Sequence, residues 1–342
     1  MTDPAEKKRV LVTGTAGFIG FHLAKLLLAN GHAVHGYDGL TDYYDVTLKE
    51  RRHSMLFEHG NFSATIGMLE DQDKVEAAMF DFKPQIIVHL AAQAGVRYSF
   101  ENPRAYISSN VTGTFNVMDV AQRLGVDHLL MASTSSVYGA NDEMPFHETE
   151  KADTQLTMYA ATKKANESMA HAYAHLHDLP ITMFRFFSVY GTWGRPDLAL
   201  YKFVDAMLDG RAIDIYNHGE MYRDFTYVDD LVRAIFLLTE AVPERPEDGI
   251  VEEGDSLSPV APFRIVNIGN SEKIRLLDFI DAIEKCLGLK ATRNMMGMQL
   301  GDVPATWADT SLLRRLTGYQ PQTDFNDGIA RFVAWFREYY NK

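Results

Sequence analysis

The chain has 342 residues, of which 46% are hydrophobic and 23% charged, and its formal net charge is −13. This length accommodates one large α/β unit or two domains, and the composition is that of an ordinary globular protein. The acidic balance disfavours nucleic acid as a partner, because it repels polyanions and no long basic stripe overrules it. A phosphorylated small molecule remains compatible, since a pocket needs only a few arginines and backbone amides.

The cysteine content and the apolar runs predict a cytoplasmic protein without a membrane segment. The one cysteine, Cys286, forms no internal disulfide, which favours a reducing compartment, and we expect it as a small core residue of a helix. The start, "MTDPAEKKRVLVTG", lacks the apolar stretch of a secretory signal. No window approaches the ~18 uninterrupted apolar residues of a membrane span.

The first half of the chain repeats one pattern, in which a short apolar run is followed by a turn and a stretch with helical spacing. The apolar runs cover residues 9–14, 33–38, 85–92, 128–133 and 181–187. Strands that alternate with helices predict an α/β fold with a doubly wound parallel sheet of the Rossmann type. We assign residues 1–187 to this first domain.

The second half consists of shorter pieces and predicts a smaller, mixed α/β domain over residues 188–342. The pieces are a helix near 198–209, the stretches 223–241 and 263–270, and a final amphipathic helix at 328–340. Segments near 212–240 and 264–271 are candidates to return to the first domain. The proline-rich and acidic stretch 242–262 predicts a mobile surface connection without chemistry.

A glycine cluster follows the first strand in "VLVTGTAGFIGFHLAKLLLANG". Gly14, Gly17 and Gly20 would let the strand turn sharply, bring backbone amides close to a pyrophosphate and allow a helix to pack tightly on the sheet. The helix N-terminus would attract the anionic charge. The sequence therefore predicts a dinucleotide site. The inward face of the helix is expected to carry Ile19, Leu23, Leu26 and Leu27.

Asp38 ends the second apolar run, where an acid is expected to meet the adenosine ribose hydroxyls. A carboxylate there repels a 2′-phosphate, and no arginine follows directly in "DGLTDYYD". NAD is therefore favoured over NADP.

Tyr159 and Lys163 are spaced i, i+4 in "MYAATKKANE", on one face of an expected helix. The pair carries little weight alone, but it follows a hydroxyl-rich strand end in a chain that already predicts a dinucleotide site. A free phenol has a pKa near 10, and two nearby positive charges, the lysine ammonium and an oxidised nicotinamide, would favour the phenolate. Tyr159 is therefore the candidate base for a substrate alcohol.

The hydroxyl cluster lies in "LLMASTSSVYG", directly after an apolar strand. In a doubly wound sheet, ligands bind at the carboxyl ends of the strands, so these hydroxyls would face the reacting carbon. We choose Thr134 first and Ser135 second as the group that bonds the substrate oxygen. A loop that caps its own backbone is the alternative.

Two histidines, His171 and His175, are also spaced i, i+4 and raise the alternative of a zinc site. No nearby acid or cysteine completes such a site, so we expect no metal and interpret both as exposed helix histidines.

Eight ordered stretches carry a resemblance to a known family. They are "VTGTAGFIGFHLA", "HLAAQAGVRYSFENPRAYISSNVTGTFNVMD", "STSSVYG", "YAATKKANE", "FFSVYGTWGRPD", "RDFTYVDD", "NIGNS" and "GDVPATWAD". Together they resemble the extended short-chain dehydrogenase/reductase superfamily and, within it, the UDP-glucuronate 4-epimerases. The resemblance runs from about residue 9 to residue 340. It implies an NAD-dependent isomerase that interconverts UDP-glucuronate and UDP-galacturonate, and a homodimer paired through helices at 101–123 and 159–177.

The resemblance also implies residue roles. Tyr159 would be the base, Lys163 its charge partner and ribose ligand, and Thr134 the assisting hydroxyl. Ser188 and Arg195 would hold the sugar carboxylate. The NAD site would comprise Gly14, Gly17, Phe18, Ile19, Gly20, Asp38, Lys49, Leu90, Ala91, Ala92 and Asn110, together with Tyr159 and Lys163. The remaining nucleotide-sugar contacts would come from Arg97, Ser136, Arg223 and Asp302.

The chain departs from the family pattern at a few positions and leaves alternatives open. Gly67 and Met68 stand where relatives usually place an acid and an aliphatic residue, which puts the adenine contact in question. Ser188 and Thr192 replace a usual threonine and proline. The rival functions are a UDP-glucuronate decarboxylase, a 4-epimerase of neutral UDP-hexoses, and an NAD-binding sensor or scaffold without turnover.

Overall fold

The computed structural model describes residues 7–342. Residues 1–6, which begin the segment considered for a secretory signal, lie outside the described residues. Among the described residues, none of the helices combines the length and apolar character that crossing a bilayer requires.

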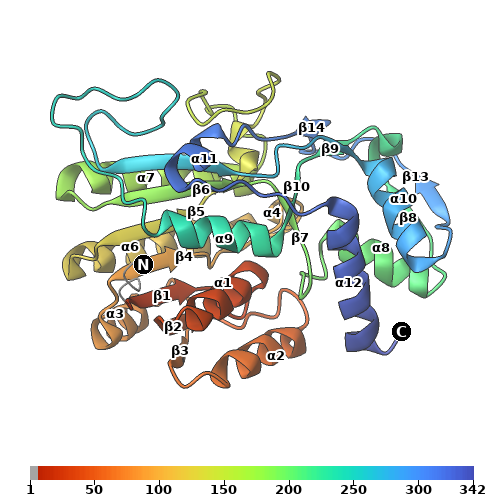
Figure 1. Cartoon of the computed structure of the whole chain (residues 1–342), viewed down its shortest axis with the longest axis horizontal. Coiled ribbons are helices and arrows are strands. Elements are labelled where there is room, and N and C mark those ends of the chain that lie inside the picture. The colour runs from red at the N-terminus through yellow and green to blue at the C-terminus, as the bar shows by residue number, and fades with distance from the viewer. Residues whose placement is uncertain (1–6) are drawn as a thin grey trace.

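The largest element is a seven-stranded parallel sheet with the order β11-β6-β5-β4-β1-β2-β3 (Figure 1). The doubly wound sheet predicted from the apolar runs is therefore confirmed. The chain order reverses between β1 and β4, which is where such sheets bind their ligands. The strands are β1 (Arg9–Thr13), β2 (Ala33–Asp38), β3 (Phe62–Ile66), β4 (Ile86–His89), β5 (His128–Ala132), β6 (Ile181–Phe186) and β11 (Phe263–Ile268).

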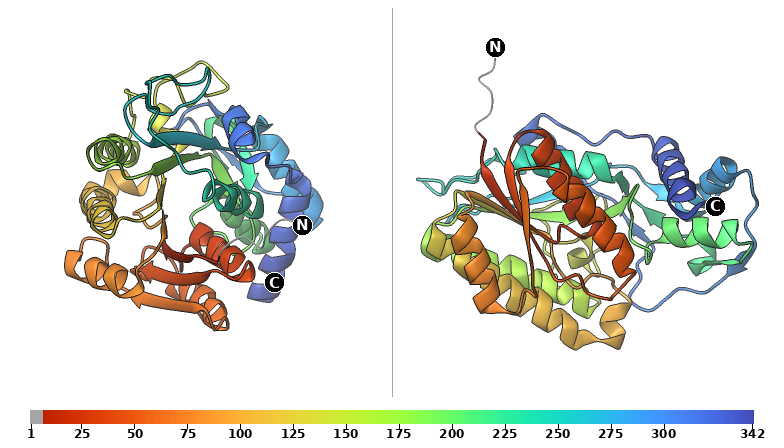
Figure 2. Two further views of the ribbon diagram at one scale, coloured as in Figure 1. Left: turned by 60° about the vertical axis from the view of Figure 1, so that its left-hand side comes forward. Right: turned by 90° about the horizontal axis from the view of Figure 1, so that it is seen from below.

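Helices cover both faces of this sheet (Figure 2). Buried strand residues alternate between the two faces: Val10 and Val12 of β1 point into one hydrophobic cluster and Leu11 into the other. One face is covered by α1 (Phe18–Ala29), α2 (Val46–Phe57), α9 (Val228–Leu238) and α11 (Ser311–Thr317). The other is covered by α3 (Gln72–Phe82), α6 (Gly113–Leu124) and α7 (Met158–His177).

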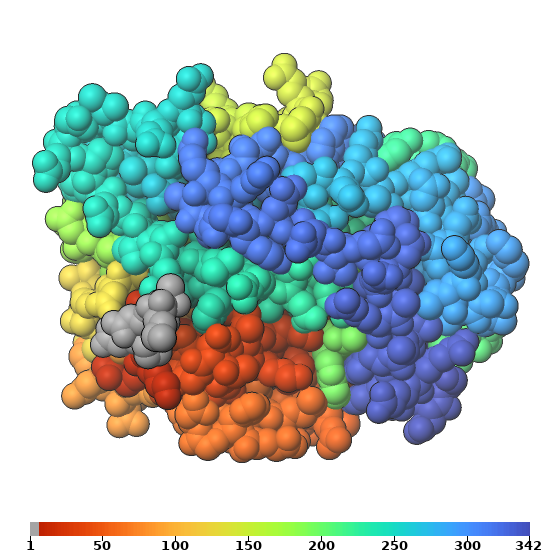
Figure 3. All heavy atoms as spheres, viewed as in Figure 1, coloured from red at the N-terminus to blue at the C-terminus, as the bar shows by residue number. Residues whose placement is uncertain are grey.

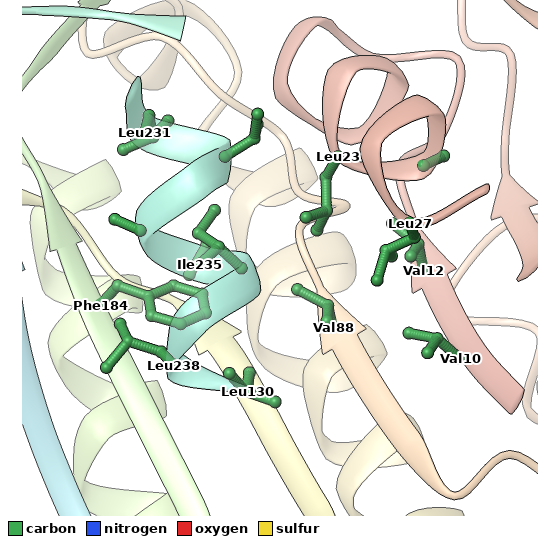
Figure 4. Packing of buried hydrophobic residues seen from close by; sticks show 14 of the residues in the cluster. Val10, Val12, Leu23, Leu27, Val88, Leu130, Phe184, Leu231, Ile235 and Leu238 are labelled. Carbon is green, nitrogen blue, oxygen red and sulfur yellow. The ribbon is translucent and has the colours of Figure 1, made fainter. Parts of the chain in front are cut away.

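The core below α1 and α9 joins early and late parts of the chain. Figure 4 shows α9 beside α1 above the strands, and Leu231, Ile235 and Leu238 of α9 belong to the same hydrophobic cluster as Leu23 and Leu27 of α1. Of the inward face predicted for α1, Leu23 and Leu27 are fully buried, whereas Ile19 and Leu26 are only partly buried. Phe21, Ala24 and Leu28 complete the buried face instead, because α1 packs against both the sheet and α9.

The second half of the chain divides between the sheet and a separate small region. Segment 264–271 largely coincides with β11, which pairs with β6, and α9 lies over the sheet beside α1. The boundary at residue 187 stays a prediction. The small region contains α8 (Ala199–Leu208), α10 (Leu276–Leu287) and α12 (Phe325–Tyr340), with the short strands β7 (Ser188–Tyr190), β8 (Ile213–Ile215), β9 (Tyr222–Arg223), β10 (Phe225–Tyr227), β12 (Ile274–Arg275), β13 (Arg293–Met295) and β14 (Ala305–Thr306).

Two expectations from the sequence require correction. Cys286 lies on the exposed face of α10, because its neighbours Ile283 and Leu287 occupy the inward positions. His171 is only partly exposed, because its ring bonds the Ser258 hydroxyl at 2.9 Å in the connection 242–262, which itself contains no helix or strand.

Candidate active site

The glycine turn joins β1 to α1 at the carboxyl edge of the sheet. Gly14 has a φ of +82°, and its carbonyl accepts a 2.9 Å hydrogen bond from the Gly17 N–H. A Cβ on Gly20 would lie 2.0 Å from the same carbonyl oxygen, so glycine is required there. Gly17 caps α1 without a side-chain bond, which leaves the N–H groups of the first turn at Phe18 and Ile19 available to an anion. This turn fits the pyrophosphate of a dinucleotide.

Asp38 and Lys49 lie beside this turn. The Asp38 carboxylate accepts the Ala16 N–H at 2.9 Å and the Leu40 N–H at 2.8 Å, so it is fixed against the glycine turn. The Lys49 ammonium bonds the Thr41 hydroxyl at 3.2 Å. Burial lowers the pKa of Lys49, and the nearby Asp38 charge partly opposes this shift. An acid and a lysine therefore stand where the sequence predicted the adenosine end of a dinucleotide.

A buried histidine holds the next strand end in place. The Thr13 hydroxyl oxygen accepts the N–H groups of Leu90 and Ala91, each at 3.0 Å, so its own proton must go to His89 Nδ1 at 2.8 Å. His89 Nε2 then carries the proton and donates to the Thr114 hydroxyl at 3.0 Å. Burial, aided by the Lys163 charge, lowers the pKa of His89 to about 3, so the ring is neutral. Sequence reasoning missed His89, although it lies inside the "HLAA" motif.

Asn110 lies in a π-helix, η1 (Ile107–Thr112), between the short helices α4 (Tyr98–Glu101) and α5 (Pro103–Tyr106) and the longer α6. Its amide bonds both backbone groups of Gln93, accepting at 2.8 Å and donating at 3.1 Å. This fixes the loop that follows β4, which includes the half-buried Ala92. The single helix expected at 101–123 is therefore interrupted, and such π-turns often occur at functional sites.

Tyr159 and Lys163 occupy the first two turns of α7, which the Thr157 hydroxyl caps at Ala160 N. Burial raises the pKa of Tyr159, while a hydrogen bond to Thr134 and the charge of Arg195 act in the opposite direction. The Lys163 ammonium donates to the Ala132 carbonyl at 3.0 Å, and burial lowers its pKa to about 8. The surrounding residues of the chain therefore do not lower the pKa of Tyr159 by themselves. The role of Lys163 as charge partner stays a prediction.

The hydroxyl cluster ends β5 and starts the short 3-10 helix η2 (Ser135–Tyr138). Thr134 Oγ1 accepts the Ser136 N–H at 3.2 Å and donates to the Ser136 hydroxyl at 3.3 Å, so it also caps this turn. The capping alternative is therefore present at Thr134, and its bond to a substrate oxygen stays a prediction. Ser133 points away and donates to Glu167 at 2.6 Å, while Ser135 and Ser136 are half-buried.

Arg195 stands close enough to Tyr159 for its charge to act on the phenol. Its guanidinium donates to both oxygens of Asp197, through Nε at 2.9 Å and Nη2 at 2.7 Å. Asp197 also accepts the Tyr43 hydroxyl at 3.4 Å. Asp197 was not predicted from the sequence, although it follows Arg195 by two residues in "GRPD". Ser188 begins β7, the strand that leads to this loop.

Three of the four other residues expected to contact the nucleotide sugar, Arg97, Arg223 and Asp302, lie near one another, whereas Ser136 lies in η2. Arg97 Nη2 lies 3.7 Å from Asp302 Oδ2, and its guanidinium carbon lies 4.4 Å from the ring centroid of Tyr216. Arg223 donates to the Tyr222 carbonyl at 2.8 Å; burial lowers its pKa and the Asp302 charge raises it. A groove runs along Arg97, Tyr216 and the segment 296–300.

The unusual Gly67 has a packing explanation. A Cβ at this position would lie 2.5 Å from the Tyr37 hydroxyl oxygen and 2.7 Å from Lys74 Cδ. The Tyr37 hydroxyl in turn donates to the Met68 carbonyl at 2.9 Å. The ring of Tyr37 therefore occupies the space that a larger side chain would need.

Comparisons with known proteins agree with this geometry. The model of the NAD dependent epimerase/dehydratase family matches residues 10–252. A probable UDP-glucuronate 4-epimerase of Rhizobium meliloti is 53% identical over 336 residues, covering 98% of each chain. UDP-glucuronate 4-epimerase 2 of Arabidopsis thaliana is 41% identical over 97% of this chain and 76% of the plant protein.

Solved structures show the same likeness. A UDP-glucuronic acid 4-epimerase from Bacillus cereus, in complex with UDP-glucuronic acid and NAD, superposes with a TM-score of 0.87 at 30% identity, covering 97% of this chain and all of that chain. The resemblance drawn from the eight motifs is confirmed. The chain belongs to the NAD dependent epimerase/dehydratase family.

Proposed function

We propose that this protein is an NAD-dependent 4-epimerase that interconverts UDP-glucuronate and UDP-galacturonate, with Tyr159 as the base. The observation that carries the proposal is the way the site fixes Arg195 next to the row of aromatic rings that leads to Tyr159. Arg195 bonds Asp197, Asp197 accepts the Tyr43 hydroxyl, and the rings of Tyr43, Tyr98, Tyr106 and Tyr159 follow one another at centroid distances of 5.0, 6.3 and 6.1 Å. In a uronate, the carboxylate carbon is bonded to C5, the neighbour of C4. A base for the C4 hydroxyl and a cation for the carboxylate must therefore belong to one site. The similar proteins from Rhizobium meliloti, Arabidopsis thaliana and Bacillus cereus support the same activity.

The residues at the first domain fit NAD. The glycine turn with Gly14, Gly17 and Gly20 would take the pyrophosphate, Asp38 the adenosine ribose, and the Leu90–Ala91 backbone the part nearer the reaction. NAD supplies reversible hydride acceptance at C4. The neutral His89 accepts the Thr13 hydroxyl proton, and Thr13 in turn binds the Leu90 and Ala91 N–H groups.

Tyr159 removes the proton of the C4 hydroxyl and returns it after the sugar has rotated to present its other face. We expect the Thr134 hydroxyl to turn from the Ser136 hydroxyl toward the substrate oxygen, and its contact with Tyr159 opposes the rise in the Tyr159 pKa. Because burial raises the Tyr159 pKa, the phenolate needs nearby positive charge. Lowering the pKa by about three units requires about 4 kcal/mol. This is about the energy with which one unit positive charge ~4 Å away stabilises the phenolate at an effective dielectric of 20. Lys163 and the bound cofactor are the proposed sources.

The sugar carboxylate would bind Ser188 and Arg195, and the diphosphate would be met by Arg97 and Arg223. A guanidinium fork suits both anions. The oxidised sugar is a β-keto acid, which loses carbon dioxide when its carboxylate bond aligns with the ketone. An arginine already fixed by Asp197 holds the carboxylate out of that alignment, which favours epimerisation over decarboxylation.

We further propose a homodimer and a cytoplasmic location. Helices α6 and α7 and the π-helix before them leave large apolar side chains exposed: Ile107 by 46%, Phe115 by 41% and Leu176 by 71%. Such a set favours pairing with a second copy through these helices. The free, exposed Cys286 favours a reducing compartment.

The test is incubation of the purified protein with NAD and UDP-glucuronate labelled with ¹⁴C in the carboxyl group. We expect UDP-galacturonate by chromatography, with the label retained in the sugar. Release of labelled carbon dioxide in step with turnover would make the protein a decarboxylase. Arg195→Ala should abolish most turnover of UDP-glucuronate; an unchanged rate would favour a neutral UDP-hexose as substrate.

A further inference from the structure

Arg52 of α2 is a fully buried cation with no role in the mechanism above. Its guanidinium donates to backbone carbonyls and one hydroxyl in three separate segments. Nη1 bonds the Ala16 carbonyl and the Tyr44 hydroxyl, each at 2.8 Å. Nη2 bonds the Trp193 carbonyl at 2.6 Å and the Gly194 carbonyl at 3.3 Å. Among the described residues, its partners are all uncharged.

A buried guanidinium without a carboxylate is costly, since each lost contact with water must be replaced. Nε remains without a partner, so the replacement is incomplete. A neutral side chain would fill this space with less penalty. The planar guanidinium, however, can donate hydrogen bonds in two directions, toward the glycine turn and toward the segment 193–194.

The segment that Arg52 holds is under backbone strain and leads directly into Arg195. Trp193 has a φ of +57°, a left-handed conformation that a bulky side chain rarely adopts. Its ring packs on Phe21 of α1 and on Trp335 of α12. Figure 3 shows a green segment of the chain between the red and orange first third and the dark blue α12. Removing Arg52 would leave the Trp193 and Gly194 carbonyls without their partner.

We propose that Arg52 is a positioning residue that sets Arg195 for the substrate carboxylate and couples this loop to the cofactor turn at Ala16. The proposal rests on the function given above, because it requires Arg195 to bind the carboxylate. A purely structural Arg52 would lower the melting temperature and weaken all ligands alike. A positioning Arg52 acts selectively on ligands that carry the carboxylate.

The experiment is a double-mutant cycle between Arg52→Met and Arg195→Ala on the NAD-loaded protein. Calorimetric titration gives the dissociation constants of UDP-glucuronate and of UDP, which lacks the sugar and its carboxylate. We expect Arg52→Met to weaken UDP-glucuronate about tenfold and UDP less than about twofold. In the Arg195→Ala background, Arg52→Met should change UDP-glucuronate binding less than about twofold.

Two further variants keep the test decisive. Arg51→Met removes the exposed neighbouring arginine and should leave both dissociation constants unchanged. If Arg52→Met does not fold, Tyr44→Phe removes one of the guanidinium's acceptors and should shift UDP-glucuronate in the same direction by a smaller factor. An unchanged UDP-glucuronate affinity in Tyr44→Phe would then overturn the proposal.

The positioning role would also be overturned if the Arg52→Met and Arg195→Ala substitutions affected UDP-glucuronate binding independently. The same holds if Arg52→Met weakened the binding of UDP and of UDP-glucuronate equally. An Arg195→Ala protein that binds UDP-glucuronate normally would overturn it as well. Failure of the proposed function would give a different result, because the wild-type protein would then form no UDP-galacturonate. The double-mutant cycle measures binding and would still test the role of Arg52.

Discussion

Substituting Gly20 by alanine tests whether the close approach of α1 to the glycine turn creates the dinucleotide site. The added Cβ would lie 2.0 Å from the Gly14 oxygen, 2.6 Å from its carbon and 3.1 Å from Thr15 N. Carbon–oxygen contacts normally begin at about 3.3 Å, so α1 and the turn must separate by about 1.3 Å. All three neighbours are backbone atoms, and α9 closes the opposite side of α1, so no flexible side chain can absorb the change.

The magnitude follows from the packing of this region. Overpacking a rigid site costs typically 1–3 kcal/mol, and backbone neighbours place Gly20→Ala at about 3 kcal/mol. For a chain of this size, about 2 °C of melting temperature is lost per kcal/mol, so we expect a decrease of about 6 °C. Displacing the turn by about 1 Å from its productive position should weaken NAD by about 10²-fold.

Scanning calorimetry and calorimetric titration with NAD measure the two effects. Gly60→Ala is the matched control, because no atom lies within 4 Å of its added Cβ and its φ is not left-handed. A Gly20→Ala protein with the same melting temperature and NAD affinity as Gly60→Ala would refute the reasoning.

Three other predictions address the base, a buried acid and the oligomer. Tyr159→Phe should lower kcat about 10³-fold while UDP-glucuronate affinity stays within a few-fold, as measured by steady-state rates and titration; full activity would remove Tyr159 as the base. Burial raises the pKa of Glu148 to about 7 from 4.5, so its contribution to stability is present below pH 4.5 and is lost as the pH rises through 7. Glu148→Gln, compared with wild type by denaturant unfolding at pH 5 and pH 8, should therefore gain about 2 kcal/mol in relative stability at the higher pH, and a pH-independent difference would contradict this. Leu176→Glu should yield monomers in sedimentation experiments, whereas Phe57→Glu, at an exposed position of α2, should not; dimers in both would place the contact elsewhere.

The sequence predicted those parts of the fold that have strong local signals. Apolar runs of residues buried on both faces marked β1, β4, β5 and β6, and the glycine spacing marked the turn before α1. Strand β3 escaped notice because it is an edge strand, paired only with β2, and its "FSATI" is half polar. The segment 264–271 was a candidate to return to the first domain, but its place beside β6 depends on a pairing across the chain that no local pattern encodes.

The candidate site was predicted where residue type alone suggests a role, and missed where a role depends on a contact. Gly14, Asp38 and Tyr159 belong to the first kind. His89 and Asp197 belong to the second, because each acts by orienting another side chain, His89 that of Thr13 and Asp197 that of Arg195. The hydrogen bond from Lys163 to the Ala132 carbonyl is likewise a contact inside the folded chain, which the sequence does not show.

The edge position of β11 bears on how the protein is made. Until the ribosome has released residue 268, β6 has no neighbour on its outer side, and its backbone donors and acceptors are open to other chains. A nascent polypeptide of this kind is prone to aggregate, so synthesis slowed between residues 187 and 262 should increase the demand for chaperones.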